Sequence, residues 1–328
     1  MNITVVGGGT GTSSVLKGLK KYNDLNINVV VTMMDDGGSN EVIREVFGLL
    51  PVSDIRKSIL ALSKTDDEKL KEIFEYRFDS GKNLKGYTVG NLILVALSKM
   101  INSEEDSIQE VSELLKVQGN VIPVTNNMCK LVAEYNNGKI REGEHSIDEP
   151  SNFLDEKIKH IYTKPTVKAN KEAVEAIKNA DYIVLGPGDI YTTTIANLLV
   201  LDIPKAITEC KGKIIYISNL MTKKGQTRHL TARGILNEIS TYAQRVPDFV
   251  VLNNRGIPQK ILNKYKKEGE KTIPDDIEKY EMYKVVREDL IEEHENKPDK
   301  GDSLVRSLIR HDCDKIGDIL KNIFDEKI

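Results

Sequence analysis

The chain has 328 residues, of which 39% are hydrophobic and 30% are charged, the composition of a globular protein that can bury a core. Its formal net charge of −3 gives no broad basic field, so we expect neither nucleic acid nor an anionic membrane surface as a partner. The three cysteines lie far apart and no apolar run approaches the length of a membrane span, so we expect no disulfide framework, zinc cluster or spanning helix. Because a strand pattern begins at once, without a charged and then apolar leader, we expect a cytoplasmic protein.

The first half of the chain predicts two strands and then a long helical stretch. The run 2–6 is β-branched and ends in glycines, and apolar residues at helical intervals follow it. The apolar run 27–31 is continuous, as in a parallel strand that is covered on both faces. Ser53 is the predicted N-cap of a further helix. We expect more helices at about 66–77, 89–101 and 104–116, part of which should form a helical cap beside the ligand crevice.

The second half predicts an antiparallel insertion in a parallel core. Short β segments and the hairpin turn Asn136-Asn137-Gly138 place this insertion at about 120–165. Helices and strands then alternate, at 170–180, 182–185, 190–200, 213–217, 230–243, 248–252 and 258–268. Residues 269–303 are charge-rich and indicate a solvated excursion with one strand near Tyr280 to Val286, before a last helix at about 314–323. We therefore expect a single α/β domain over residues 1–328.

The loop Gly7-Gly8-Gly9-Thr10-Gly11-Thr12 joins the first strand to the first helix. Glycines let a ligand approach the backbone, and the free amides of a helix N-terminus attract a phosphate. The loop lacks the Gly-Lys-Ser/Thr of a P-loop, and Thr12 stands where the last glycine of G-x-G-x-x-G would fall. We predict that this loop binds the phosphates of a nucleotide; a tight turn without a ligand is the alternative.

Two adjacent carboxylates, Asp35 and Asp36, follow the second strand and precede a glycine pair. A dinucleotide fold places at this point the acid that holds ribose hydroxyls, and two carboxylates can equally hold Mg²⁺ between phosphates. A solvated turn is the third interpretation, since Asp and Gly favour turns.

Polar residues also stand in the first turns of two predicted helices. Arg56 can bind a phosphate through both guanidinium nitrogens while Asp54 orients it, although a charged pair at a helix start is as good a reading. Gly90 and Asn91 are poor helix formers, which suggests close approach of a ligand and an amide that binds its polar groups.

A second strand-to-helix glycine loop is Gly186-Pro187-Gly188-Asp189, with Thr192 close behind it. Two such loops in one parallel sheet predict a crevice at the carboxyl ends of the strands. Asn219, Thr222 and Asn253 follow later strands and occupy equivalent positions, where an ordinary turn is the alternative. His311 has charged neighbours, but a lone histidine is more often structural and no hydrolytic triad is visible.

Eight segments in this order resemble the bacterial gluconeogenesis-factor family, within the larger group related to 2-phospho-L-lactate transferase. They are GGGTG (7–11), MMDDGGS (33–39), LLPVSDIRKS (49–58), YTVGNL (87–92), GPGDIYTT (186–193), NLMTKKGQT (219–227), VLNNRGIP (251–258) and RHD (310–312). The resemblance implies a Rossmann-like, doubly wound, mainly parallel sheet. The chain departs from the family pattern at Asn40 and Glu41, where a Gly-Arg pair is usual, and so lacks one basic residue that could contact phosphate.

The resemblance also implies binding of a nucleotide sugar, UDP-N-acetylglucosamine, and a role in growth and cell shape on gluconeogenic carbon sources. It implies that Thr10 and Gly11 contact phosphate, that Asn219 and Asn253 line the crevice, and that Tyr265 and Arg310 come from the C-terminal part. Tyr265 can stack on a base or sugar, or can simply be a helix-face aromatic, and Arg310 can neutralise a phosphate.

Three functions are open at the level of the sequence. The first is a ligand-sensing regulator, which needs no catalytic group. The second is a 2-phospho-L-lactate transferase-like enzyme, in which Asp35 or Asp36 holds Mg²⁺. The third is an NAD-type dinucleotide binder, suggested by the strand, glycine loop and helix at the start. A homodimer is the default expectation for the assembly, because most soluble oligomers are symmetric dimers.

Overall fold

A computed structural model of the chain describes residues 1–149, 157–278, 282–293 and 307–328. In this part of the chain seven parallel strands form one sheet in the order β10-β9-β8-β7-β1-β2-β3. The strands are β1 (Asn2–Gly7), β2 (Asn26–Val31), β3 (Asn120–Pro123), β7 (Tyr182–Leu185), β8 (Lys213–Ile217), β9 (Phe249–Asn253) and β10 (Lys284–Glu288). The expected mainly parallel α/β sheet is confirmed.

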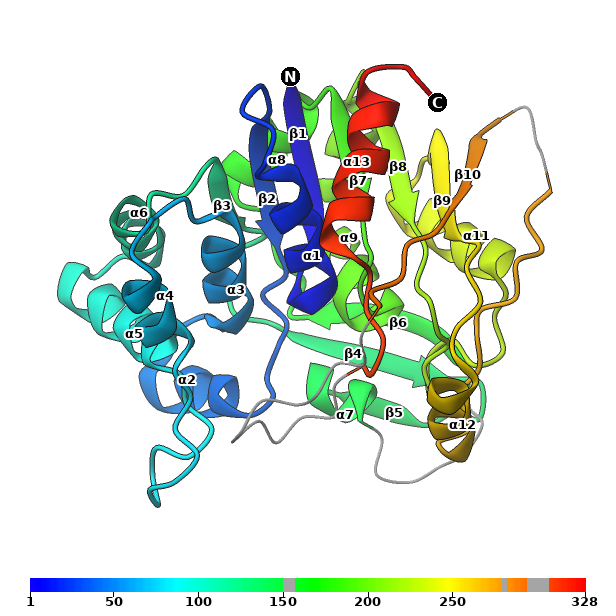
Figure 1. Cartoon of the computed structure of the whole chain (residues 1–328). Helices are drawn as coiled ribbons and strands as arrows, with labels where there is room; N and C mark the ends of the chain where they lie inside the picture. The colour runs from blue at the N-terminus through cyan, green and yellow to red at the C-terminus, as the bar shows by residue number, and fades with distance from the viewer. Residues whose placement is uncertain (150–156, 279–281, 294–306) are drawn as a thin grey trace.

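Helices cover both faces of this sheet (Figure 1). One face carries α1 (Gly9–Leu19), α3 (Ser53–Leu62) and α13 (Cys313–Phe324), and the other carries α8 (Lys171–Lys178), α10 (Ile203–Glu209) and α11 (Ala232–Ala243). Side chains of the inner strands are buried on both sides, as the continuous apolar runs predicted: Ile3, Val5, Val29 and Ile183 are fully buried.

The strand order reverses between β1 and β7, which are neighbours in the sheet. From β1 the chain proceeds outward through β2 to β3, and it then returns to β7 and proceeds outward the other way through β8, β9 and β10. The loops after β1 and β7 therefore leave the sheet side by side at this topological switch point, where open α/β sheets bind their ligands.

A smaller antiparallel sheet lies beyond the carboxyl ends of the parallel strands, with the order β5-β4-β6 (Figure 1). It consists of β4 (Lys130–Tyr135), β5 (Ile140–Glu142) and β6 (Ile158–Lys164), and the short helix α7 (Glu144–Asp148) follows β5. Both chain termini lie at the opposite end of the molecule (Figure 1). The predicted hairpin at 136–138 is confirmed, and the small sheet forms a wall on the ligand side of the fold.

The helical stretch lies beside the sheet at its β3 edge (Figure 1). It contains α2 (Ser39–Phe47), α4 (Glu68–Glu75), α5 (Val89–Ile101) and α6 (Glu104–Leu114). Helix α2 was not predicted, because the Asp-Gly turn before it resembles a loop. Of these helices α5 and α6 pack against each other, and α6 contacts β3.

The structure corrects three boundaries of the sequence analysis. Residues 120–123 are not part of the antiparallel insertion: they form β3, which pairs in parallel with β2. The expected helix 190–200 is a π-helix, η1 (Ile190–Ile195), that continues into α9 (Ala196–Leu198). The expected strand near 280–286 is β10 at 284–288, and it joins the main sheet as an edge strand, whereas Tyr280 and residues 294–303 of the charged excursion lie outside the described residues. Helix α12 (Gln259–Lys267) follows β9 as predicted.

Candidate functional site

The two glycine loops touch each other at the switch point. A Cβ atom on Gly11 would lie 2.2 Å from the carbonyl oxygen of Pro187, so only a glycine fits at this position. A Cβ atom on Gly8 would lie 2.6 Å from a carboxylate oxygen of Asp54, a side-chain atom that would have to shift to make room. The loops after β1 and β7 thus form one continuous backbone surface, as the sequence analysis required.

A cavity of about 320 Å³ opens over this surface. Fourteen of the residues that the sequence analysis singled out line it: Gly8, Gly9, Thr10, Gly11, Asp35, Asp54, Pro187, Gly188, Asp189, Thr192, Asn219, Thr222, Tyr265 and Arg310. They come from the exits of four strands, β1, β2, β7 and β8, from helices α3 and α12, and from the segment before α13. The structure therefore brings together segments that are up to 300 residues apart in the sequence.

The amino end of α1 points amides at one end of the cavity. The amides in the first turn of a helix have no acceptor within the helix, so those of Thr10 and Gly11 are available to a ligand. The Gly9 amide is used differently, because it donates to a carboxylate oxygen of Asp54 at 2.8 Å. Lys57, one turn further along α3, donates to the other oxygen of Asp54 at 2.8 Å. Lys57 lines the cavity and supplies a cation close to the first glycine loop.

Asp35 and Asp54 form a pair of like charges at this end. Burial of the Asp35 carboxyl group and the nearby Asp54 charge together raise the pKa of Asp35 to about 6. Two groups partly offset this effect, since the Gly37 amide donates to Asp35 at 2.9 Å and the Asn40 side chain donates at 2.7 Å. Asn40 is one of the departures from the family pattern, and its contact holds the Asp35 carboxyl group in place.

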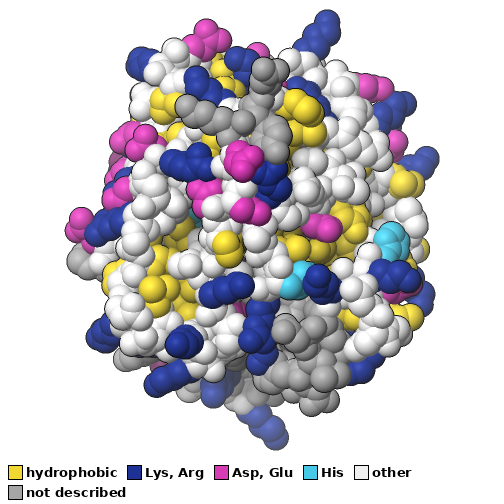
Figure 2. All heavy atoms as spheres, turned by 90° about the vertical axis from the view of Figure 1, so that its right-hand side faces the viewer, with side chains coloured by type: hydrophobic (Ala, Val, Ile, Leu, Met, Phe, Trp, Pro, Cys, Tyr) yellow, Lys and Arg dark blue, Asp and Glu magenta, His cyan; other side chains and the backbone are white. Residues whose placement is uncertain are grey.

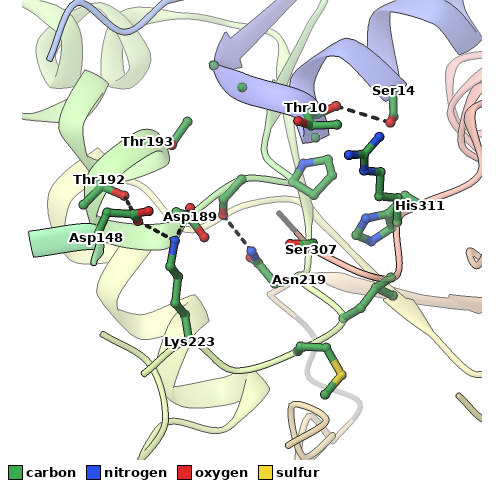
Figure 3. A pocket seen from close by; sticks show the side chains of 18 of the residues that line it. Thr10, Ser14, Asp148, Asp189, Thr192, Thr193, Asn219, Lys223, Ser307 and His311 are labelled. Carbon is green, nitrogen blue, oxygen red and sulfur yellow. Dashed lines mark hydrogen bonds and ion pairs between the residues drawn. The ribbon is translucent and has the colours of Figure 1, made fainter. Parts of the chain in front are cut away.

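The opposite end of the cavity holds an ion-pair cluster (Figure 3). Lys223, from the loop after β8, contacts Asp148 of α7 and lies 2.8 Å from Asp189 of the second glycine loop. Thr192 and Gln226 also donate to Asp148, at 3.1 and 3.0 Å. Burial alone would lower the pKa of Lys223, but the two carboxylates outweigh it and raise the pKa, so the lysine is charged. The cluster ties the small sheet to the main sheet across the cavity.

Glu144 adds a further carboxyl group to this end. Its pKa is raised well above the ordinary value, first by burial and then by the charges of Asp148 and Asp35. Burial also acts against ionisation of Asp148, but contact with Lys223 outweighs it and lowers the pKa of Asp148. The pKa values of Glu144 and Asp148 thus shift in opposite directions, because Asp148 forms an ion pair with Lys223 whereas the charges of Asp148 and Asp35 act on Glu144.

The C-terminal part of the chain closes another side. Tyr265 of α12 is 5% exposed, and its hydroxyl group accepts the amide of Leu308 at 3.0 Å. This bond fixes the segment that carries Arg310 and His311, both of which line the cavity. His311 is 6% exposed, and burial lowers its pKa to about 4.

Six predicted site residues lie outside the lining. The Thr12 hydroxyl accepts the Gly8 amide at 2.8 Å, and Asp36 accepts the amide of His145 at 2.8 Å. The Asn253 side chain donates to the Arg255 carbonyl group at 2.7 Å and accepts the Leu290 amide at 3.1 Å. The other three are Gly186, which has a φ of +74°, Arg56 and Asn91. Thr12 and Asp36 shape the loops that carry the site, and Asn253 shapes the turn after β9.

Arg56 and Asn91 belong to a buried network behind the cavity. Nε of Arg56 donates to Oδ1 of Asn91 at 2.9 Å, and both side chains are buried. The amide nitrogen of Asn91 donates to the hydroxyl of Ser53 at 3.0 Å, and Ser53 in turn donates to Asn40. Through Asn40 this network reaches Asp35, so Arg56 and Asn91 support a lining residue without lining the cavity themselves.

Sequence reasoning missed seven charged lining residues: Lys57, Glu144, Asp148, Glu149, Lys223, Glu268 and Glu270. Lys57 follows Asp54 by three residues on a helix, a spacing that places both on one face, so this signal was present. Lys223 directly follows Thr222, which was predicted. Glu144 and Asp148 had no local signal, because Asp148 meets Lys223 across 75 residues of sequence.

The comparisons with known proteins agree on one family. A family model described as 2-phospho-L-lactate transferase CofD matches residues 3–291. The gluconeogenesis factor of Listeria monocytogenes is 36% identical over 325 residues, which cover 97% of this chain and 94% of that protein. The gluconeogenesis factor of Bacillus subtilis is 32% identical, over 99% of this chain and 98% of that protein. The chain belongs to the gluconeogenesis-factor family.

A solved structure supports the gluconeogenesis-factor fold. The crystal structure of a UPF0052-family protein from Bacillus halodurans superposes with a TM-score of 0.86, at 31% identity and over 98% of each chain. Within the described residues of this gluconeogenesis-factor chain, no helix has the length and apolarity that crossing a membrane requires. The same residues include no group of three or more His, Cys, Asp or Glu side chains arranged to hold a metal ion.

The outer surface of this gluconeogenesis-factor chain gives an anion no general attraction on the face seen in Figure 2. Lys and Arg side chains there are interspersed with Asp and Glu side chains and with small hydrophobic areas. Inside the cavity, the α1 amides, Lys57 and Arg310 are groups that can attract an anion.

Proposed function

We propose that this chain is a cytoplasmic regulatory protein that binds a nucleotide sugar, UDP-N-acetylglucosamine, and is required for growth and normal cell shape on gluconeogenic carbon sources. The observation that carries the proposal is the contact between the two glycine loops at the switch point, where Gly11 lies against Pro187. Backbone amides and helix ends at such a point suit a diphosphate.

The two ends of the cavity suit the two parts of such a ligand. Near α1, the free amides, Lys57 and Arg310 can neutralise phosphate oxygens. Near Lys223, the oxygens of Asp148, Asp189 and Glu144 can accept hydrogen bonds from the hydroxyl groups of a sugar. A nucleotide sugar carries both kinds of group in one molecule.

A binding experiment tests the proposal. Because a ligand that binds only the folded state stabilises it by mass action, millimolar UDP-N-acetylglucosamine should raise the melting temperature. UDP, NAD and UDP-glucose serve as comparison ligands. A clear shift with NAD and none with UDP-N-acetylglucosamine would replace the proposal by an NAD-type dinucleotide binder.

The biological role needs a separate experiment. A strain that lacks this chain should grow poorly and lose its shape on a gluconeogenic carbon source, and the wild-type chain should restore both. A chain with Arg310→Ala, which loses a cation of the cavity, should fail to restore them if ligand binding is required. If the Arg310→Ala chain does not bind the nucleotide sugar but still restores growth and shape fully, the biological role does not depend on ligand binding in the cavity.

The Asp35 and Asp54 pair favours a second function, a transferase similar to the 2-phospho-L-lactate transferases. Burial and the nearby Asp54 charge raise the pKa of Asp35, and a cation would relieve the repulsion, so Asp35 could supply one oxygen ligand to a bound Mg²⁺. When bound there, the ion would neutralise phosphate oxygens of the substrate, while Lys57 and the α1 amides orient the substrate. Mixing the protein with UDP-N-acetylglucosamine and Mg²⁺ and following the ³¹P resonances tests this function. New phosphorus species would show turnover. Unchanged spectra would count against turnover of this ligand and leave ligand binding as the remaining function.

A further inference from the structure

His311 is held rigidly at the edge of the cavity by the backbone on both sides of it. The Glu292 amide donates to the Arg310 carbonyl group at 3.1 Å, and the Asp312 amide donates to the Leu290 carbonyl group at 2.8 Å. The Asp312 carboxylate then caps α13 by accepting the amides of the two residues that follow Cys313. These bonds and the cap fix the backbone on both sides of His311 beside the cavity that it lines.

One nitrogen of the His311 ring has a fixed role. Nε2 lies 3.1 Å from the carbonyl oxygen of Ser218, at the end of β8. A carbonyl oxygen only accepts hydrogen bonds, so Nε2 must carry a proton and donate it. Since the ring is buried and its pKa is about 4, the histidine is neutral at physiological pH. A neutral imidazole has one proton, and Nδ1 is therefore left as an acceptor.

The position of His311 places the acceptor atom Nδ1 beside the cavity, where a ligand could donate a hydrogen bond to it. Thr10, Ser14 and His311 appear together on the side of the cavity opposite the Lys223 cluster (Figure 3). Within the described part of the chain no donor to Nδ1 is present, and Nδ1 is not among the fully buried atoms that lack a partner. Because His311 lines the cavity, a ligand in the cavity is the candidate donor to Nδ1.

We propose that His311 is a specificity-determining residue, whose unprotonated Nδ1 accepts a hydrogen bond from an O–H or N–H group of the bound nucleotide. The inference rests on the proposed function, because it presumes a nucleotide in this cavity. A site that hydrogen-bonds a donor group strongly rejects analogues that lack it, since its own polar atom is then left unpaired. The candidate donors are the imide N–H of uracil, a ribose hydroxyl and a hydroxyl of the sugar.

Calorimetric titrations with matched ligands test the proposal. N3-methyl-UDP removes the imide donor, 2′-deoxy-UDP and 3′-deoxy-UDP each remove one ribose donor, and a comparison of UDP with UDP-N-acetylglucosamine removes the sugar. For wild-type protein one of these losses should weaken binding about tenfold. In the His311→Phe variant, which keeps a ring and lacks the acceptor, the same loss should have no further effect. His311→Asn retains an acceptor oxygen and should recover part of the affinity.

The proposal is supported if the effects of the His311 substitution and of one ligand modification on the binding free energy are not additive. It is overturned if these effects are additive for every ligand modification. If His311 had a structural role alone, the variants would be less stable, but they would still discriminate between UDP and its analogues as the wild-type protein does. The ¹⁵N spectrum of the wild-type protein gives a test without variants or ligand. It should show Nδ1 unprotonated and Nε2 protonated, and a protonated Nδ1 would overturn the inference even if no tested nucleotide binds. Failure of wild type to bind any uridine ligand would instead refute the proposed function.

Discussion

A Cβ atom on Gly11 would lie 2.2 Å from the carbonyl oxygen of Pro187, so the two glycine loops meet backbone to backbone. One loop follows β1 and the other follows β7, and 176 residues of sequence separate the two contact points (187 − 11). Because the contact is between main chains, side chains cannot rearrange to relieve an intrusion, and the geometry of the two loops depends on the absence of a methyl group at Gly11.

Replacing Gly11 with Ala should therefore push the loops apart. We expect a loss of about 1–3 kcal/mol in the free energy of unfolding from overpacking, and at least tenfold weaker binding of UDP-N-acetylglucosamine. Urea unfolding and calorimetry measure the two effects. Gly256→Ala is the matched control, because nothing lies within 4 Å of a Cβ atom there, and it should be nearly neutral. Wild-type affinity in the Gly11 variant would show that the contact does not shape the site.

Replacing Lys223 with Met should destabilise the fold, because it leaves Asp148 and Asp189 without their cation. Breaking a fully buried pair costs about 3–5 kcal/mol, and we expect about 2–3 kcal/mol here since the Lys223 side chain is 28% exposed. Adding Asp148→Asn should recover part of the loss. Lys69→Met, which breaks an exposed ion pair with Glu72, is the control and should leave the urea midpoint unchanged. If Lys223→Met and Lys69→Met had the same urea midpoint, the ion-pair cluster around Lys223 would not contribute to stability.

Replacing Arg310 with Ala should weaken nucleotide-sugar binding by about 1–3 kcal/mol, through loss of a charge-assisted contact. Calorimetry at two salt concentrations should also show a smaller salt dependence than for wild type. Arg255→Ala removes a partly exposed arginine that pairs with Asp289 outside the cavity, and its affinity should match wild type. If the two variants bind equally well, Arg310 does not contact the ligand.

The Asp35 carboxyl group should make stability fall as pH rises. Its folded-state pKa is about 6 and its ordinary value is 3.8, so the folded state holds the proton more tightly than the unfolded state. This group thus contributes stability below about pH 4, and the contribution is lost between pH 4 and 6. A carboxyl NMR titration should give a lower pKa for Asp35 in an Asp54→Asn variant. Titration near 4 in wild type would contradict the prediction.

Replacing Asn91 with Ala should lower stability without weakening ligand contacts directly. The change removes the acceptor of the buried Arg56 Nε, and loss of a buried hydrogen bond to a charged group costs about 1.5–3 kcal/mol. Thermal unfolding should show the loss, while affinity measured well below the melting temperature should change less than for Arg310→Ala. A drop in affinity as large as that of the arginine variant would mean that the network positions Asp35 for the ligand.

Local patterns in the sequence were sufficient for the parallel core and its loops. The run 27–31 is apolar throughout because β2 is covered on both faces, and the glycines of 7–11 and 186–188 mark the strand exits. The position of β3 was not predictable in this way. Its four residues, Asn120–Pro123, pair with β2 across about 90 residues, and their composition resembles that of the insertion that follows.

The basic and acidic walls of the site were predicted less well than its backbone. A glycine loop can be recognised from the sequence, because few other residues adopt its backbone conformation. A lysine or glutamate that faces a cavity cannot be distinguished in the sequence from one that faces solvent. Lys223 and Asp148 became identifiable only after the fold had placed α7 beside the loop after β8. Arg56 and Asn91 show the converse error, since polar residues at helix starts suggested ligand contact where a buried network is formed.

Helices α1 and α13 touch through glycines, since a Cβ atom on Gly18 would lie 2.1 Å from the carbonyl oxygen of Cys313. Helix α1, which begins at the first glycine loop, therefore packs directly against α13, which follows Arg310 and His311, although the two helices lie near opposite ends of the sequence. During synthesis, the glycine loops of a nascent chain exist long before residues 310–311 emerge from the ribosome. An interrupted product would thus have both glycine loops but lack Arg310 and His311, so the lining of the cavity is complete only once the C-terminal part of the chain has been made.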